Sequence, residues 1–208
     1  PQMKQLDGRM MWTIDGDRSM GVGSASSVVY ADGRKADGVE FAQWLVSEVH
    51  PGCSQVKERL EVMDASGIWA QIIYPNVIGF AGQGRAPAGT KLQPVDPELR
   101  LITTQIYNDA MAEMQADSGG RLLPMAVLPW WDIKLALAEA ERCVALGMKG
   151  VNINSDPQLH GMEDLSGDYW TPLWELCSDR NLPINFHIGA SDSSMSFDLR
   201  RSVSRRWP

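Results

Sequence analysis

Four short segments carry the side chains best suited to chemistry, because each follows an apolar run of strand length. They are residues 74–76, 129–132, 152–154 and 186–189. In parallel β/α folds the reactive groups collect at the carboxyl ends of the strands, where the loops converge over the sheet. The last segment contains His187, whose imidazole can offer one nitrogen to a divalent metal while its other N–H is held by an acceptor. On position alone, a metal ligand, a catalytic base and a structural histidine in the core all remain open.

Two asparagines and two tryptophans in these segments are candidates for contact with a substrate. The amides of Asn76 and Asn154 can orient a substrate oxygen or a metal-bound water, although a strand-end asparagine also commonly caps the following loop. Trp130 and Trp131 supply rigid apolar area and one N–H donor each, which suits a wall against a planar substrate. We expect one of the two indoles to serve ordinary packing.

Other catalytic chemistries lack their motifs. His50 and His160 form no HxH, HxxxH or HExxH spacing, and we expect both on the surface. No GxSxG motif is present, and the three cysteines lie far apart without CxxC spacing. A catalytic zinc site normally requires three protein ligands, whereas these residues offer one convincing candidate, His187. The residues by themselves therefore indicate an incomplete metal site.

The elements that must position these side chains alternate between strand and helix patterns after Gly52. Strands are predicted at 68–74, 122–128, 150–154 and 182–187, and helices at 54–65, 97–118, 133–146 and 170–179. The first strand is expected to be buried on both faces. The long second helix, capped by Asp96, is expected to bury an apolar stripe of Leu99, Ile102, Ile106 and Ala110.

This alternation predicts an α/β fold of the (β/α)₈ TIM-barrel type, with about half of the barrel, four or five β/α units, in this chain. An open sheet that binds a nucleotide or sugar is the alternative, but the glycine-rich stretch 79–89 lacks GxGxxG spacing. We expect a loop-rich segment with a short hairpin or helix at 1–52, the partial barrel at 53–190 and an irregular tail at 191–208.

Net charge and the length of apolar runs limit the kinds of partner that we expect for this chain. The formal net charge of −7 comes from mixed acidic and basic residues, which argues against a nucleic-acid or anionic-membrane surface. No apolar run approaches the ~20 residues that span a bilayer. We therefore expect a cytoplasmic protein with a small-molecule substrate. A half-barrel leaves sheet edges uncovered, so a homodimer or larger homo-oligomer is also expected.

Several separated motifs between Val56 and Ala190 resemble those of known proteins. They are RLEVMD at 59–64, YPN at 74–76, YND at 107–109, RLLP at 121–124, GMKGVNIN at 147–154 and LPINFHIG at 182–189. In order and spacing they resemble the amidohydrolase-related family, a branch of the amidohydrolase superfamily that includes aminocarboxymuconate-semialdehyde decarboxylase and related nonoxidative decarboxylases. The tail departs from the family's pattern after Met195.

The resemblance implies a single divalent metal, usually zinc and sometimes manganese, at the mouth of a barrel. His187 matches the family's ligand on strand five. The family's remaining ligands would precede Pro1 and follow Pro208. It implies a metal-dependent hydrolase that acts on a small carboxylated or aromatic substrate through a metal-activated water. A nonoxidative decarboxylase of the same family is the alternative, as is a remnant without a full metal site.

Overall fold

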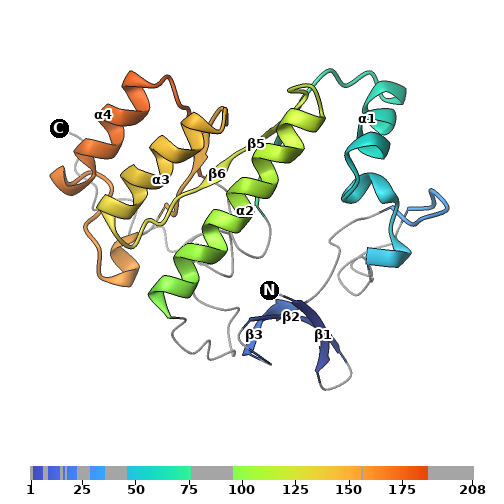
Figure 1. Cartoon of the computed structure of the whole chain (residues 1–208), viewed down its shortest axis with the longest axis horizontal. Helices are drawn as coiled ribbons and strands as arrows, with labels where there is room; N and C mark the ends of the chain where they lie inside the picture. Colours follow the sequence, from blue (N-terminus) through green and yellow to red (C-terminus); the bar gives the residue numbers. More distant parts are fainter. Residues whose placement is uncertain are drawn as a thin grey trace, which may run out of the picture.

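Parallel strands and connecting helices form the larger part of the molecule (Figure 1). The computed structural model describes residues 2–6, 9–14, 16, 18–22, 29–35, 46–75, 96–155 and 157–186. After residue 55 the order is α1 (Val56–Ala65), β4 (Gln71–Ile73), α2 (Pro97–Asp117), β5 (Leu122–Pro124), β6 (Ala126–Val127), α3 (Ile133–Ala145), β7 (Val151–Asn152), α4 (Thr171–Asp179) and β8 (Ile184–Asn185). Each strand and helix predicted in this part is present, and the strands are shorter than predicted.

The strands pair in the order in which they occur along the chain. β4 pairs with β5, and β6 pairs with β7, which pairs with β8, all in parallel. The Met125 amide donates to the Ile73 carbonyl at 2.9 Å and joins the two ladders. Sequential parallel pairing is the arrangement of a barrel segment, and it argues against the reordered strands of an open nucleotide-binding sheet.

Local signals explain where the two main helices begin and end. The Asp96 carboxylate accepts from the first amides of α2, and the Asp132 carboxylate accepts from those of α3, each at 2.8 and 3.2 Å. Gly119 and Gly147 follow these helices with positive φ angles of 64° and 86°. The predicted cap of α2, Asp96, is confirmed. α1 begins two residues later than predicted, and the side chain of Gln55, which precedes it, makes no capping bond.

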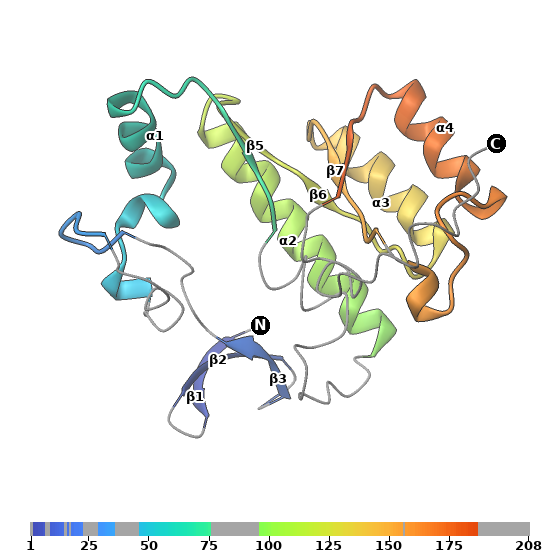
Figure 2. The same ribbon diagram turned by 180° about the vertical axis from the view of Figure 1, so that it is seen from behind.

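The hydrophobic core lies between the parallel strands and the helices that cover one of their faces (Figure 2). Its strand side chains include Leu128, Val151 and Ile153. Its helix side chains come mainly from α3 and α4: Ala136, Ala140, Cys143, Leu173 and Cys177. This layer leaves the opposite face of the same strands for polar side chains.

The buried face of α2 differs from the prediction. Ile102, Ile106 and Ala110 of the expected stripe are exposed. The buried residues are instead mostly polar: Thr103, Thr104, Asn108, Ala112 and Gln115. The side chains of Thr103, Thr104 and Asn108 bond to backbone carbonyls or to buried partners, which offsets the cost of burying them. Periodicity predicted the helix correctly and its buried face wrongly.

Strand β4 is also more exposed than expected. Ile72 is exposed within the strand, and Trp69 just before it is 82% exposed. In the described ranges β4 pairs on one side only, with β5. The prediction of a strand buried on both faces is therefore wrong for β4 in this chain.

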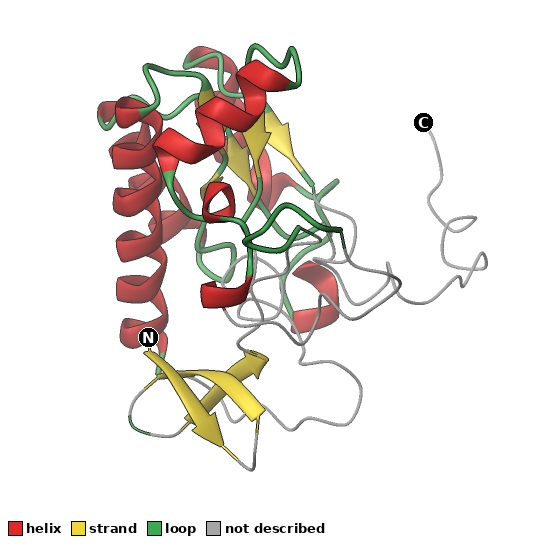
Figure 3. Cartoon of the chain, turned by 90° about the vertical axis from the view of Figure 1, so that its right-hand side faces the viewer, coloured by secondary structure: helices red, strands yellow, loops and turns green. Residues whose placement is uncertain are grey.

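The first residues form a small antiparallel sheet instead of one hairpin. Strands β1 (Gln2–Leu6), β2 (Arg9–Ile14) and β3 (Arg18–Val22) pair in sequence order, and the sheet lies at one end of the molecule (Figure 3). None of these three strands was predicted individually, because such short strands lack a sustained apolar alternation. Within the described ranges, no helix combines the length and apolar character that a bilayer crossing requires. The predicted tail at 191–208 lies outside the described residues.

Candidate active site

Three asparagines gather at the carboxyl ends of β7 and β8. Asn152 and Asn185 are register partners in the parallel ladder. Asn154 follows Asn152 by two residues, and side chains alternate along a strand, so the two share a face. Asn152 is 1% exposed and Asn154 is 4% exposed. The face opposite the helical core is therefore amide-lined and buried.

Tyr74 links the end of β4 to this face. Its hydroxyl donates to Asn185 Oδ1 at 3.0 Å, across 111 residues of sequence. The Asn185 amide nitrogen approaches Met125 Sδ at 3.0 Å and the Val151 carbonyl at 3.3 Å. The bond from Tyr74 holds the ends of two strands that are not neighbours in the sheet.

Asn152 offers an acceptor to a ligand. Its side-chain oxygen is buried and accepts no hydrogen bond from any described residue. A buried acceptor left in this state costs about 1–3 kcal/mol. A donor on a bound molecule would recover that energy.

A cation and two indoles lie beside the end of β6. The Arg100 guanidinium carbon stands 3.6 Å from the Trp131 ring centroid and 5.1 Å from that of Trp130. The indoles meet edge to face, with centroids 6.2 Å apart. Burial lowers the pKa of Arg100 to about 10, so this side chain stays charged at neutral pH.

The same cluster contains a histidine that was expected on the surface. The His160 ring is half-buried, 4.9 Å from the Trp130 ring by their centroids. Trp130 belongs to the hydrophobic core and Trp131 packs against it. Packing is the role that these contacts show for the indoles, and contact with a substrate stays a prediction. His50 is half-buried as well, and its Nδ1 accepts from the Gly52 amide at 3.1 Å.

The described residues do not form a metal site by themselves. Among them, no group of three or more histidine, cysteine, aspartate or glutamate side chains is placed to hold a metal ion. His187 and Asn76, the predicted metal ligand and one predicted substrate contact, lie outside the described residues. The assignment of His187 as a metal ligand therefore stays a prediction.

Three residues of the amide-lined face were not singled out from the sequence, and one of them, Asn185, lies just outside the segment at 186–189. Asn152, Asn185 and Tyr74 were not predicted as site residues. A spacing of two was the available signal, because Asn152 precedes Asn154 and Asn185 precedes His187 by two residues. The bond from Tyr74 had no signal in the sequence, since it depends on how the strands are arranged.

The similarities to known proteins lie in one family. The model of the amidohydrolase family matches residues 51–205. The chain is 32% identical over 136 residues to gamma-resorcylate decarboxylase of Polaromonas sp., a match that covers 62% of this chain and 37% of that protein.

Solved structures give the same result. A 2,6-dihydroxybenzoate decarboxylase complexed with 2,6-dihydroxybenzoate aligns with a TM-score of 0.50 and 26% identity, over 72% of this chain and 43% of that one. The fold also matches 5-carboxyvanillate decarboxylase from Novosphingobium aromaticivorans, solved with bound manganese, with a TM-score of 0.57 and 21% identity over 81% and 44% of the two chains. The chain spans about two fifths of the length of these relatives. Since the family model covers well over half of the chain, the protein belongs to the amidohydrolase family.

Proposed function

We propose that the chain serves a nonoxidative decarboxylase that acts on a small aromatic carboxylate. The match to gamma-resorcylate decarboxylase supports this activity over the hydrolase that we first expected, which has support at the level of the family only. The structural observation that carries the proposal is the buried, amide-lined face at the carboxyl ends of β7 and β8. This is the edge where (β/α)₈ barrels hold their substrates.

In the proposed reaction, the bond between the ring carbon and the carboxyl carbon breaks and CO₂ leaves. The ring carbon keeps the electron pair and takes a proton. The amides of Asn154 and Asn152 would bind polar groups of the ring, and Asn76 would add a third amide. Trp130 and Trp131, beside the charged Arg100, would flank the ring.

A divalent metal with His187 as one ligand is part of the proposal. Manganese is the first metal to test, because the related 5-carboxyvanillate decarboxylase was solved with it, and zinc is the second. This assignment of a metal rests on the family and not on the described geometry.

Calorimetric titration with Mn²⁺ tests the assignment of the metal ligand. Mn²⁺ is titrated into the chain, into His187→Ala and, as a matched control, into His50→Ala, whose imidazole caps a short helix away from the site. We expect stoichiometric binding that His187→Ala abolishes and His50→Ala keeps. Equal binding by all three proteins, or binding by none, would contradict the metal assignment.

Titration with 2,6-dihydroxybenzoate then tests the amide-lined face. We expect Asn154→Ala to weaken binding about tenfold, the loss of roughly one hydrogen bond to a charged ligand. Unchanged affinity would remove Asn154 from the substrate site.

A catalytically incomplete remnant is the second candidate. Its motivation is that the sequence offers one convincing metal ligand, His187. A remnant would bind 2,6-dihydroxybenzoate without releasing CO₂ from it, whereas a decarboxylase would do both.

We also propose a homo-oligomer. The exposed apolar side chains at the unpaired side of β4, Trp69 and Ile72, would be covered in it. Sedimentation equilibrium measures the mass directly, and a monomer at micromolar concentration would refute the proposal.

A further inference from the structure

The backbone of Val127 pairs with a side chain where a neighbouring strand would be expected. Its amide donates to Asn108 Oδ1 at 2.8 Å, and Asn108 Nδ2 donates to its carbonyl at 2.9 Å. Two residues earlier on the same strand, Met125 still bonds to Ile73 of β4. Asn108, on α2, therefore takes the place of β4 at the point where β4 has ended.

This replacement supplies hydrogen bonds to the Val127 amide and carbonyl, which would otherwise have no partner at this edge of the strand. Asn108 is completely buried, so neither its amide nor the Val127 peptide can bond to bulk water. The pairing also lets the chain leave the sheet after Ile73, so that Tyr74 reaches Asn185. One side chain thus allows β4 and β6 to separate at the carboxyl edge.

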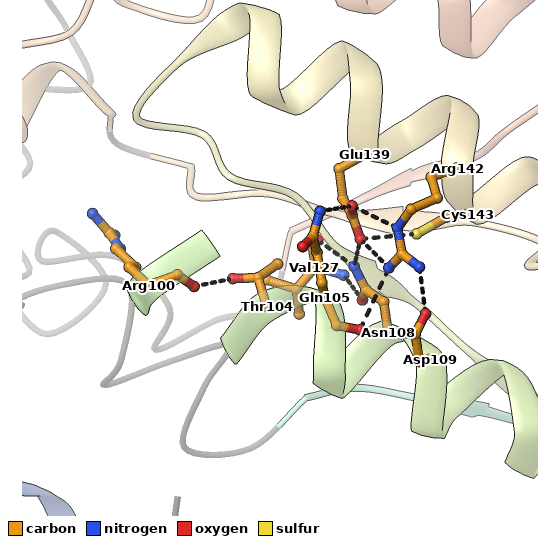
Figure 4. Close-up of polar contacts among 9 residues, drawn as sticks. All are labelled: Arg100, Thr104, Gln105, Asn108, Asp109, Val127, Glu139, Arg142 and Cys143. Atoms are coloured by element: carbon orange, nitrogen blue, oxygen red, sulfur yellow. Dashed lines mark hydrogen bonds and ion pairs between the residues drawn. The ribbon is translucent and has the colours of Figure 1, made fainter. Parts of the chain in front are cut away.

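Glu139 on α3 favours the same orientation of the Asn108 amide as the Val127 peptide does (Figure 4). Its buried carboxylate accepts from Asn108 Nδ2 at 2.6 Å. An ionised carboxylate accepts hydrogen bonds and donates none. It therefore selects the orientation in which Nδ2 faces Glu139 and the Val127 carbonyl, and Oδ1 faces the Val127 amide. The flipped amide would place an oxygen against the carboxylate.

Arg142 compensates the buried charge. Its guanidinium donates to both oxygens of Glu139, at 2.7 and 2.9 Å, and also pairs with Asp109. Burial raises the pKa of Glu139, but the hydrogen bonds from Arg142 and Asn108 outweigh it and leave that pKa below its ordinary value. The carboxylate thus stays ionised at neutral pH and keeps its orienting role.

We infer that Asn108 is a positioning residue for the proposed active site. Oriented by Glu139, it fixes the backbone at Val127, and the loop that carries Trp130 and Trp131 begins two residues later, at Pro129. The inference rests on the proposed function only in assigning this loop to the site. Its test needs no substrate and no metal.

Hydrogen exchange at single amides tests the inference. The amides of Ala126 and Leu128 bond to the backbone of the segment around β7, so they are internal references for Val127. In Asn108→Ala we expect the Val127 amide to exchange at least about tenfold faster relative to both references, because its opening no longer requires the strand to unfold. Equal acceleration of all three amides, or none, would overturn the inference.

Gln115→Ala is the matched control. Gln115 is a buried amide on the same helix, and it donates to the Gly147 carbonyl at 2.7 Å, away from β6. We expect this variant to lose stability without changing the exchange of Val127 relative to its references. A change equal to that of Asn108→Ala would show a general effect of α2 and overturn the inference.

A polarity swap tests the role of Glu139, and it serves if Asn108→Ala does not fold. Asn108→Asp keeps an acceptor for the Val127 amide but sets two carboxylates against each other, so protection of Val127 should fall. Adding Glu139→Gln supplies a donor to Asp and should restore most of that protection. A double variant no better than Asn108→Asp would overturn the orienting role. Failure of 2,6-dihydroxybenzoate to bind would refute the proposed function and leave these exchange results standing.

Discussion

Helices α2 and α3 cover neighbouring parts of one face of the parallel strands, yet they bury opposite kinds of side chain. α3 buries mainly small apolar residues, Ala136, Ala140 and Cys143, in the core that it shares with α4. α2 buries threonines and amides and leaves Ile106 55% exposed. Glu139 and Arg142 of α3 join the two helices through Asn108.

The difference shows that burial follows available partners as well as hydropathy. A polar side chain can be buried at little net cost when its hydrogen bonds are satisfied. Asn108 obtains this from the open edge of Val127, and Thr103 from the carbonyl of Leu99. α3 faces strands whose edges are already paired, so apolar contact stabilises it.

The largest effect should come from the apolar layer. Leu173→Ala removes a fully buried side chain where α4 packs on α3, and we expect it to lower the unfolding free energy by about 2–5 kcal/mol. Urea denaturation measures the loss. Leu146→Ala, at an exposed position after α3, is the control and should change stability by less than about 0.5 kcal/mol. Equal losses would contradict the assigned core.

The cluster of Asn108, Glu139 and Arg142 should make the stability of the fold depend on pH. Glu139 has a lowered pKa, so its ionised form contributes stability above its ordinary value of 4.5, and this contribution is lost as the pH falls through the lowered value. Glu139→Gln should cost about 1.5–3 kcal/mol at pH 7, the value of a charge-assisted hydrogen bond. It should also flatten the acid limb of stability against pH. An unchanged acid limb would show that other carboxyls produce it.

Isoleucines on the two helices give a direct comparison. Ile133→Ala on α3 loses core contacts and should cost roughly 2 kcal/mol, whereas Ile106→Ala on α2 should change stability by less than about 0.5 kcal/mol. Thermal unfolding of both variants measures the difference. A larger cost for Ile106→Ala would contradict the exposed position of this side chain and would show that Ile106 is buried, either in an oligomer or in the apolar stripe that the sequence predicted.

Loss of a helix cap should have the smallest effect on the difference between α2 and α3, because an aspartate caps both helices in the same way. Asp132→Ala should cost about 1 kcal/mol, and Asp132→Asn, which keeps an acceptor for the first amides, should cost less. Equal losses in chemical denaturation would assign the effect to the charge and not to the hydrogen bond.

Local features were predictable from sequence and long-range ones were not. Asp96, Asp132 and Gly147 delimit helices through contacts within a few residues, and these bounds were predicted well. The buried face of α2 depends on an edge of β6 that lies 19 residues away. The Tyr74–Asn185 bond depends on the arrangement of four strand segments, so no local pattern encodes it. For the same reason the sequence identified Asn154 but not its partners.

The central claim is that this chain supports decarboxylation at the carboxyl edge of its parallel strands. The most direct test is CO₂ release from 2,6-dihydroxybenzoate in the presence of Mn²⁺, followed with the wild-type chain, His187→Ala and Ile106→Ala. We predict one CO₂ per molecule of 1,3-dihydroxybenzene formed, abolished by His187→Ala and unchanged by Ile106→Ala. Absence of CO₂ from the wild-type chain, or equal release by His187→Ala, would contradict the claim.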